Sequence, residues 1–585
     1  MVFVSFPKDD EFDINSIPDS IPISQFLLDE KYGRCSYASS KPPFICVSGR
    51  QYTALEVRQR VEFLSRALAK ELSWAPNEGS EWDKVVTIFS QNTIDTLTVS
   101  WAVHRLSGVS SPTNAVYTAA ELGYQVKSSR SKVIFTCLPL LGTALEAAKK
   151  CGIPPKNVFL LSMPEGFAGG LESPSPDSFK SVDTLIESGA TLPSIEPLNW
   201  QKGQGARQCA FLMFSSGTTG LPKGVMVSHR NVIANILQIC AFEAPTRTPE
   251  TRNVNLGLLP QSHIYGLVAI CHTSVYRGES VVVLPKFDLQ VLGRAIERFR
   301  INVLYVVPPI VLSMASKSQL LAPFDLSSVT EVFSGAAPLT VQLAWTLLLQ
   351  YPTWKFRQAY GLTESATVIA ATSPEDILLG SCGNLLPGVE ARLISSGDGS
   401  EIHEYNTPGE LYVRSPSITT LGYLDNPKAS AETFSASGWL RTGDEAMIVT
   451  NSQGNGKPTE HLKIVDRIKE LIKVKGHQVA PAELEACLLT HPLVADAAVV
   501  SISDTTHGEL PKAFVVLREL PFSAIVSGDV RDDIDGFVRK QKAHYKWLRG
   551  GIEIVDAIPK NSSGKILRRL LKEREGQKRA TAARL

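Results

Sequence analysis

The sequence predicts an α/β protein, with a large N-terminal unit of packed sheets and helices followed by a small α+β unit. Two observations support this. Short apolar runs rich in β-branched residues alternate with helical patterns through most of the chain, which is typical of largely parallel sheets. After about residue 466 the alternation restarts on a smaller scale. Since 585 residues exceed the size at which single cores stop growing, we divide the chain into residues 1–465 and 466–585.

The elements of the large unit follow from run length and spacing. The short apolar runs that predict strands are residues 85–89, 133–137, 158–161, 210–214, 281–284 and 303–307. The stretches with apolar residues at helical spacing are 229–240, 289–300 and 341–349. Residues 163–176, rich in Pro, Gly and Ser, predict an exposed loop, and residues 450–460 predict a polar surface insertion.

The small unit is predicted in the same way. Its expected order is helix 481–489, strands 495–501 and 513–517, helix 530–542, strand 552–555 and a basic tail.

Composition excludes several classes of protein. The net charge of +1 does not predict a nucleic-acid or membrane partner. No apolar run approaches about 18 residues, so no transmembrane helix is expected. The N-terminal sequence becomes acidic within its first residues, which is unlike a secretory signal. Nine scattered cysteines without a CxxC pair predict reduced thiols and no zinc site.

Residues 214–225 read FSSGTTGLPKGV, and an apolar run precedes them while a helical pattern follows. Glycines let backbone amides approach phosphate oxygens, and hydroxyls add donors without bulk. Lys223 adds a point charge. The loop is not a Walker P-loop, because Lys223 is followed by Gly224 where that motif needs Ser or Thr. The alternative is a Ser/Gly-rich surface turn.

Further motifs follow in order along the chain. They are LPQSHIYG at 259–266, YGLTE at 360–364, TGD at 442–444, DR at 466–467, KVKG at 473–476 and PKNSSGK at 559–565. Taken singly, Asp444 could cap a turn and Lys565 could be a solvated charge. His263 and Tyr360 could each be ordinary core residues. Their joint order favours a functional site.

The ordered set resembles the adenylate-forming (AMP-binding) superfamily, which contains acyl-CoA synthetases, 4-coumarate–CoA ligases, beetle luciferases and peptide-synthetase adenylation domains. The resemblance covers residues 52 to 569, and the string DRIKELIKVKGHQVAPAELE at 466–485 is most similar to the 4-coumarate–CoA ligase-like branch. It implies a large adenylate-forming domain, a small mobile domain and a hinge at about 466–469.

The resemblance implies an ATP-dependent carboxylic acid–CoA ligase. The carboxylate would attack the α-phosphate of ATP to give an acyl-adenylate and pyrophosphate, and the CoA thiol would then displace AMP. Glu364 would ligate Mg²⁺. The residues implied to bind ATP or AMP are Ser215, Ser216, Gly217, Thr218, Thr219, Gly220, Lys223, Gly335, Ala336, Ala337, Tyr360, Gly361, Thr363, Glu364, Asp444, Arg467 and Lys565.

The residues implied to take part in catalysis are Lys565, Lys473, His263 and Thr363. Lys565 would bridge the carboxylate and the α-phosphate, where negative charge builds up. After rotation of the small domain Lys565 would leave, and Lys473, Lys475 and Gly476 would enter to form the CoA tunnel.

The acyl pocket is implied to contain His263, Tyr265, Val307, Ser334, Gly335 and Gly361, within walls at 263–268, 306–312, 334–338 and 360–368. These residues are mostly small or aliphatic, which suits an aliphatic chain or a planar aryl acid alike. Ala359 stands where many relatives carry glycine, and Gln261-Ser262 precede the histidine where many carry an aromatic residue. No acidic residue occurs between 256 and 275, which disfavours an amino acid substrate.

The tail from Lys560 to Leu585 carries nine Lys/Arg and two Glu. A nucleic-acid role is the weaker interpretation, because no aromatic residue is present to stack on bases. A solvated helix face with a loose end is preferred. Ala583, Arg584 and Leu585 resemble the peroxisomal address of which Ser-Lys-Leu is the type, so we expect an import receptor as partner and a peroxisomal, otherwise cytoplasmic, location.

Three alternatives to a CoA ligase stay open from the sequence: a luciferase-like oxidase, an enzyme that passes its adenylate to a carrier protein, and a nucleotide-binding scaffold without catalysis. No carrier domain follows Lys565, and the charged motif residues are all present.

Overall fold

The structure is a computed structural model. It describes residues 3–4, 12–164, 166–167, 178–215, 222–247, 252–337, 339–452, 458–474, 477–504, 508–518, 530–561 and 564–582.

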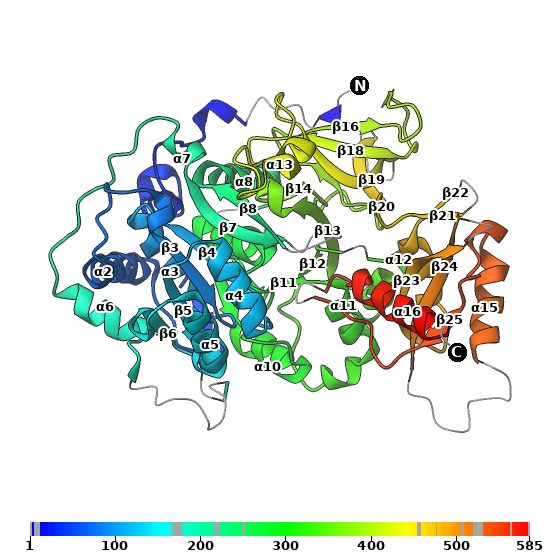
Figure 1. Ribbon diagram of the computed structural model, residues 1–585, viewed down its shortest axis with the longest axis horizontal. Coiled ribbons are helices and arrows are strands. Elements are labelled where there is room, and N and C mark those ends of the chain that lie inside the picture. Colours follow the sequence, from blue (N-terminus) through cyan, green and yellow to red (C-terminus); the bar gives the residue numbers. More distant parts are fainter. Residues whose placement is uncertain are drawn as a thin grey trace.

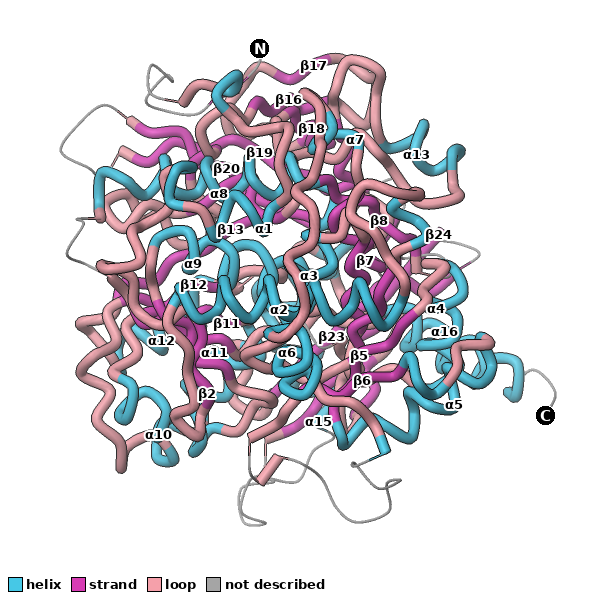
Figure 2. Tube along the Cα trace, turned by 90° about the vertical axis from the view of Figure 1, so that its left-hand side faces the viewer, coloured by secondary structure: helices cyan, strands magenta, loops and turns pink. Residues whose placement is uncertain are grey.

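The first sheet is mainly parallel and is built from residues of the N-terminal part of the chain. Its strands in spatial order are β6 (Val158–Leu161), β5 (Val133–Cys137), β3 (Val85–Phe89), β4 (Val109–Thr113), β7 (Cys209–Ser215) and β8 (Lys223–Ser228). All neighbours are parallel except β7 and β8. The surrounding helices are α2 (Ala54–Leu72), α3 (Thr96–Arg105), α4 (Ala119–Ser128), α5 (Leu141–Cys151) and α6 (Val182–Ala190). Figure 2 shows α2, α3 and α6 on the face turned toward the viewer.

The second sheet lies at the centre of the molecule (Figure 1). Its order is β15 (Asn384–Leu385), β14 (Thr367–Ala371), β13 (Lys355–Leu362), β12 (Glu331–Ser334), β11 (Val303–Val306), β9 (Val254–Gly257), β10 (Ser280–Val283) and β2 (Phe44–Cys46). Strands β2 and β9 to β13 are parallel, whereas β14 and β15 are antiparallel. Its helices are α8 (His229–Glu243), the π-helix η8 (Tyr265–His272), α9 (Thr273–Arg277), α10 (Leu289–Phe299), α11 (Pro308–Ser316) and α12 (Val341–Gln350).

A third, antiparallel sheet completes the large unit and was not predicted. It contains β1 (Phe3–Val4), β16 (Glu390–Ile394), β17 (Glu401–Ile402), β18 (Gly409–Arg414), β19 (Leu440–Asn451) and β20 (Thr459–Arg467), with α13 (Pro427–Thr433) beside it. Residues 450–460 were expected to be a surface insertion. Asn451 pairs with Thr459, so the segment contains the ends of the paired strands β19 and β20, and its residues 453–457 lie outside the described part.

The small unit forms its own sheet at the right of Figure 1. The order is β22 (His477–Val479), β21 (Ile472–Val474), β24 (Gly508–Leu517) and β23 (Val494–Asp504), and β25 (Ile552–Ile554) pairs with β24. The helices are α14 (Pro481–Leu489), α15 (Val530–Gln541) and α16 (Arg568–Ala582). The order predicted for this unit is confirmed, because its apolar runs are short and well separated.

The remaining short helices are α1 (Ile23–Leu28), α7 (Gln204–Arg207), η1 (Ile14–Ser16), η2 (Glu30–Tyr32), η3 (Glu81–Asp83), η4 (Leu138–Leu140), η5 (Pro155–Asn157), η7 (Ala244–Thr246), η9 (Ser318–Leu320), η10 (Thr363–Ser365) and η12 (His544–Lys546). None of the described helices combines the length and the apolar character needed to span a bilayer.

The glycine–hydroxyl loop connects elements differently from the prediction. Helix α8 does begin at His229, where Ser228 and Asn231 form a capping box. The loop itself, however, joins the antiparallel strands β7 and β8, with Ser215 opposite Lys223. In this second strand Val225 and Val227 lie on either side of the partly buried Met226, and both side chains enter the core.

The basic tail is only partly solvated. Helix α16 buries Leu571 in a cluster with residues of β23 and β24, and several of its cations pair with carboxylates of the small unit. These pairs include Arg574–Glu553 at 2.9 Å and Lys578–Glu553 at 2.6 Å. These pairs attach the helix to the sheet of the small unit.

Candidate active site

Tyr360, Asp444 and Arg467 meet although they come from two different sheets. The Tyr360 hydroxyl donates a 2.6 Å hydrogen bond to Asp444 Oδ2, and Arg467 Nε lies 3.4 Å from Asp444 Oδ1. Asp444 and Arg467 are cross-strand neighbours on β19 and β20. Burial raises the pKa of Asp444, while the Arg467 charge and the Tyr360 hydrogen bond oppose that rise. The result is a carboxylate fixed between an aromatic hydroxyl and a guanidinium.

Lys565 reaches the same place from the small unit. Its neighbour Gly564 lies against Val307 and Pro309 of the large unit, so closely that a Cβ would come within 3.0 Å of Pro309 Cδ. Burial lowers the pKa of Lys565 to about 8, with a further lowering from Arg467 and an opposing contribution from Asp444. Lys565 therefore lies in the electrostatic field of the Asp444 cluster.

His263 belongs to this neighbourhood too. It lies just before helix η8, and its Nδ1 accepts a hydrogen bond from the Tyr265 backbone N–H at 3.3 Å. Burial lowers the pKa of His263 to about 4, and the charge of Lys565 adds to the effect. The imidazole is consequently neutral at ordinary pH.

Glu364 and Lys223 are connected through a residue that the sequence did not single out, Tyr423. The Tyr423 hydroxyl donates a 2.8 Å hydrogen bond to Glu364 Oε1, and Lys223 Nζ lies 5.0 Å from the centroid of the Tyr423 ring. Tyr423 is held by a bridge to Val225 of β8. Because this contact joins segments about two hundred residues apart, no local sequence pattern indicates it.

The backbone between β13 and β14 is tightly constrained. A Cβ at Gly361 would fall 1.5 Å from the Thr367 carbonyl oxygen, so no side chain fits there. Ala366 and Thr367 adopt positive φ values of 52° and 134°, and Ala336 adopts 70°. Such conformations are strained for residues with a Cβ, and strain of this kind gathers at functional sites.

The other described residues predicted to bind nucleotide lie at the ends of strands. Thr363 opens η10 directly after β13, Ser215 ends β7, and Gly335 to Ala337 follow β12. The Ser334 hydroxyl is buried without a hydrogen-bond partner among the described residues. Ser216, Gly217, Thr218, Thr219, Gly220, Lys475, Gly476, Ala583, Arg584 and Leu585 lie outside the described residues.

Lys473 does not join this cluster. It lies on β21, its side chain is exposed, and its backbone N–H donates a 2.8 Å hydrogen bond to Glu509 Oε2. The two lysines of the small unit thus occupy different environments.

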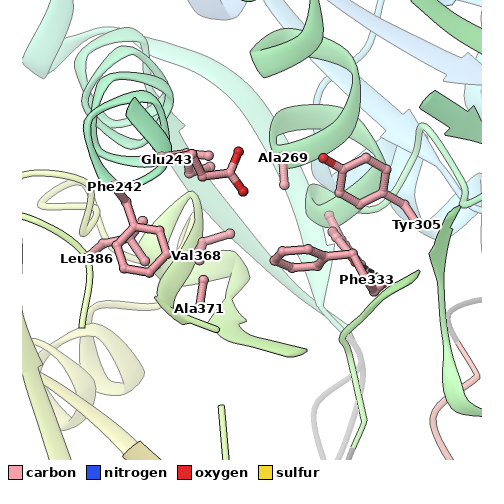
Figure 3. A pocket seen from close by; sticks show the side chains of 10 residues that line it. Phe242, Glu243, Ala269, Tyr305, Phe333, Val368, Ala371 and Leu386 are labelled. Carbon is pink, nitrogen blue, oxygen red and sulfur yellow. Dashed lines mark hydrogen bonds between the residues drawn. The ribbon is translucent and has the colours of Figure 1, made fainter. Parts of the chain in front are cut away.

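A small cavity lies against strands β11, β12 and β14 of the second sheet (Figure 3). It is lined by Ile239, Phe242, Glu243, Tyr265, Ala269, Tyr305, Phe333, Val368, Ala371 and Leu386. Tyr265 and Val368 fall within the predicted acyl-pocket walls. Gly335 borders the cavity through Tyr265, whose Cε1 would lie 3.1 Å from a Cβ at that glycine, and Gly361 is the strand partner of Val368.

The rest of the lining was missed by sequence reasoning. His263, Val307 and Ser334 do not line the cavity itself. The missed residues come from the end of α8, from η8, from strands β11, β12 and β14 and from Leu386 after β15. Apart from Glu243 they are apolar or aromatic, and the sequence does not distinguish them from ordinary core residues.

Comparison with protein families gives two matches. The description "AMP-binding enzyme" matches residues 36–424, and "AMP-binding enzyme C-terminal domain" matches residues 483–565. The chain belongs to the AMP-binding enzymes. The resemblance to the adenylate-forming superfamily is confirmed, and so is the expected α/β fold with a large N-terminal domain and a small α+β C-terminal domain.

Curated relatives cover almost the whole chain. The acyl-CoA ligase easD of Emericella nidulans is 41% identical over 95% of this chain and 97% of its own length. The acyl-CoA ligase AKT1 of Alternaria alternata is 41% identical, covering 95% of each. These relatives confirm the enzyme class, an AMP-forming acyl-CoA ligase.

Solved structures share the fold. The anthranilate CoA ligase AuaEII, in complex with anthranoyl-AMP, has a TM-score of 0.79 at 22% identity and covers 98% of this chain and 100% of its own. ATP-bound MatB from Rhodopseudomonas palustris has a TM-score of 0.76 at 23% identity, covering 94% and 98%.

Proposed function

We propose that this AMP-binding enzyme activates an aliphatic or aryl carboxylic acid with ATP and transfers the acyl group to CoA, releasing AMP and pyrophosphate. The observation that carries the proposal is the convergence of Lys565 with Asp444, Arg467 and His263. The cation from the small unit comes close to the residues that we propose bind the nucleotide, and this supports adenylate formation.

In the first step the described residues position two negatively charged reactants. Tyr360 stacks on adenine, while Asp444 accepts hydrogen bonds from the ribose hydroxyls and Arg467 contacts the ribose. Thr363 donates to the α-phosphate, and Lys565 bridges that phosphate and the carboxylate. Since like charges must meet, positioning and neutralisation account for most of the rate.

Glu364 suits Mg²⁺ as a single protein carboxylate. No group of three or more possible metal ligands occurs among the described residues, but Mg²⁺ in nucleotide sites uses one or two carboxylates together with phosphate oxygens. The Tyr423 hydrogen bond occupies Glu364 Oε1 and holds the carboxylate in one orientation. When bound, the ion neutralises charge on the departing pyrophosphate.

For the second step we propose that the small unit, residues 466–585, rotates about residues 466–469. Lys565 leaves the cluster, and Lys473, Lys475 and Gly476 replace it beside the incoming CoA thiol. The exposed position of Lys473 supports this, because a residue needed only after rotation should lie outside the cluster before it.

The test is AMP release from ATP and Mg²⁺ with a panel of aliphatic, cinnamic, benzoic and amino acids, with and without CoA, with products read by mass spectrometry. We expect AMP and thioester to form together. They should form with aliphatic or aryl acids, and only when CoA is present. Adenylate without thioester in the presence of CoA would replace the proposal with a carrier-dependent or oxidative enzyme.

We also propose that the terminal Ala583-Arg584-Leu585 directs the protein to peroxisomes through an import receptor. A fluorescent reporter carrying the last ten residues should collect in peroxisomes. The control is the same reporter without the last three residues, which should stay cytosolic. If the complete reporter also stays cytosolic, the proposal is overturned.

A further inference from the structure

Asn92 connects the first sheet to the segment that carries His263. It lies in the loop between β3 and α3 and is only 6% exposed. Its side-chain Nδ2 lies between 3.1 and 3.4 Å from four backbone carbonyl oxygens, those of Gly257, Leu258, Leu259 and Leu284. These carbonyls stand at the ends of β9 and β10 or just beyond them. One side chain of the first sheet thus binds the edge of the second.

The contact between the two segments is reciprocal. Asn92 Oδ1 accepts a 2.9 Å hydrogen bond from the Gln261 backbone N–H, and Gln261 Oε1 accepts one of 3.1 Å from the Thr93 backbone N–H. Gln261 is only 3% exposed. Each amide side chain therefore binds the backbone of the other's segment. Because buried polar groups are costly to leave unpaired, the pair holds one segment in a fixed position on the other.

His263 lies between this pair and a second anchor. Its backbone N–H donates to the Pro260 carbonyl at 3.0 Å, so the turn that carries it begins inside the segment bound by Asn92. On the other side, the Thr367 hydroxyl donates to the Ile264 carbonyl at 3.0 Å. The backbone around His263 is consequently fixed at both ends.

The direction of the imidazole depends on this placement. Its Nδ1 accepts a hydrogen bond from the Tyr265 backbone N–H, so the neutral ring carries its proton on Nε2. The Nε2–H is then a donor that can reach an oxygen of the acid being activated. A donor contributes to the rate only where it is well aligned, and a displacement of about 1 Å can cost about 10²-fold.

We propose that Asn92, together with Gln261, is a positioning residue for adenylate formation, because it sets where the His263 imidazole stands relative to the reacting acid. This rests on the proposed ligase function. Both side chains act through the backbone of residues 257–263 and not on the reactants. The first sheet thereby contributes to the chemistry of a site that is built mainly from the other sheets.

The primary variant is Gln261→Met, which keeps the length of the side chain and removes its amide. Asn92→Ala, which removes five hydrogen bonds at once and can unfold the protein, is the second. The matched control is Gln208→Met. Gln208 is 6% exposed, its Nε2 donates to the Ser107 carbonyl at 2.9 Å, and it lies at the end of β7 opposite the glycine–hydroxyl loop.

The rate of adenylate formation is followed by pyrophosphate release. We expect Q261M and N92A to lower kcat by about 10–100-fold with little change in KM for ATP, and Q208M to stay within about twofold of the wild type. A double-mutant cycle with H263A separates positioning from a merely structural role. Q261M should lower kcat little further once His263 is absent. The proposal is overturned if Q261M leaves kcat unchanged, or if its effect is the same with and without His263.

A second measurement needs no activity. Diethylpyrocarbonate modifies neutral imidazoles, and peptide mass spectrometry reads its reaction at His263. Q261M should react about threefold faster or more than the wild type and Q208M, because the segment around His263 is held less firmly. If the wild type forms no adenylate with any acid, the ligase function is refuted. Equal reaction of His263 in all three proteins would separately overturn the positioning role.

Discussion

Lys565 and His263 belong to different units of the chain, yet the Lys565 charge adds to the effect of burial in holding the pKa of His263 at about 4. The contact of Gly564 with Val307 and Pro309 brings the lysine to this position. Because Lys473 is exposed at the same time, the arrangement corresponds to the adenylate-forming step of the proposed cycle.

The two lysines should separate the half-reactions. Lys565→Ala should lower adenylate formation by about 10²–10³-fold, since it removes a cation aimed at developing charge, and should retain CoA transfer from supplied acyl-adenylate. Lys473→Ala should do the reverse. Pyrophosphate release and thioester formation are followed separately, and equal loss of both in either variant would refute the assignment.

Adenylate formation should decline as the pH rises through about 8. Lys565 must be protonated to carry its charge, and its pKa is lowered to about 8 by burial and by Arg467. The profile of kcat/KM reports the free enzyme, so the alkaline limb should appear there. The K565R variant keeps a charged guanidinium at this position, so it should have reduced activity that no longer declines as the pH rises through about 8. If the decline is unchanged in K565R, another group causes it.

Tyr423→Phe should weaken use of Mg-ATP. The variant removes the hydrogen bond that orients Glu364, and the loss of one such bond corresponds to about 3–10-fold in KM for Mg-ATP. Tyr405→Phe is the control, because Tyr405 donates a similar 2.5 Å hydrogen bond to Glu460 on an exposed hairpin. Similar Mg²⁺ titration curves for both variants would contradict the role given to Tyr423.

Arg357→Met should destabilise the fold by about 3–5 kcal/mol, because it leaves Glu243 and Glu331 buried with fewer counterions. Arg130→Met, which breaks an exposed pair with Asp425, should cost at most about 1 kcal/mol. Chemical denaturation measures both free energies of unfolding. Equal costs would show that the buried cluster contributes nothing special to stability.

The sequence predicted α14, α15, β23, β24 and β25 of the small unit and six strands of the first two sheets, because their apolar runs are short and clearly bounded. It did not predict β21 and β22, or strands such as β2, β4 and β8. It missed the third sheet, since β16 alternates buried and partly buried residues and antiparallel pairing leaves no βαβ pattern to recognise.

Motif residues such as Asp444 and Lys565 could be found from the chain alone, because their types and order are informative. Tyr423, Tyr305 and Glu243 could not. Glu243 resembles a solvent-exposed charge at a helix end until Arg277 and Arg357, which come from other elements, surround it.

The pairing of β2 with β10 bears on how the chain is made. The two strands are adjacent in the second sheet, and the Ser280 hydroxyl bonds the Pro42 carbonyl across 238 residues of sequence. At roughly 5–20 residues per second, a ribosome needs about 12–48 s between them. Strand β2 therefore waits without its sheet partner while all the strands of the first sheet are synthesised, so its apolar residues stay exposed for much of translation.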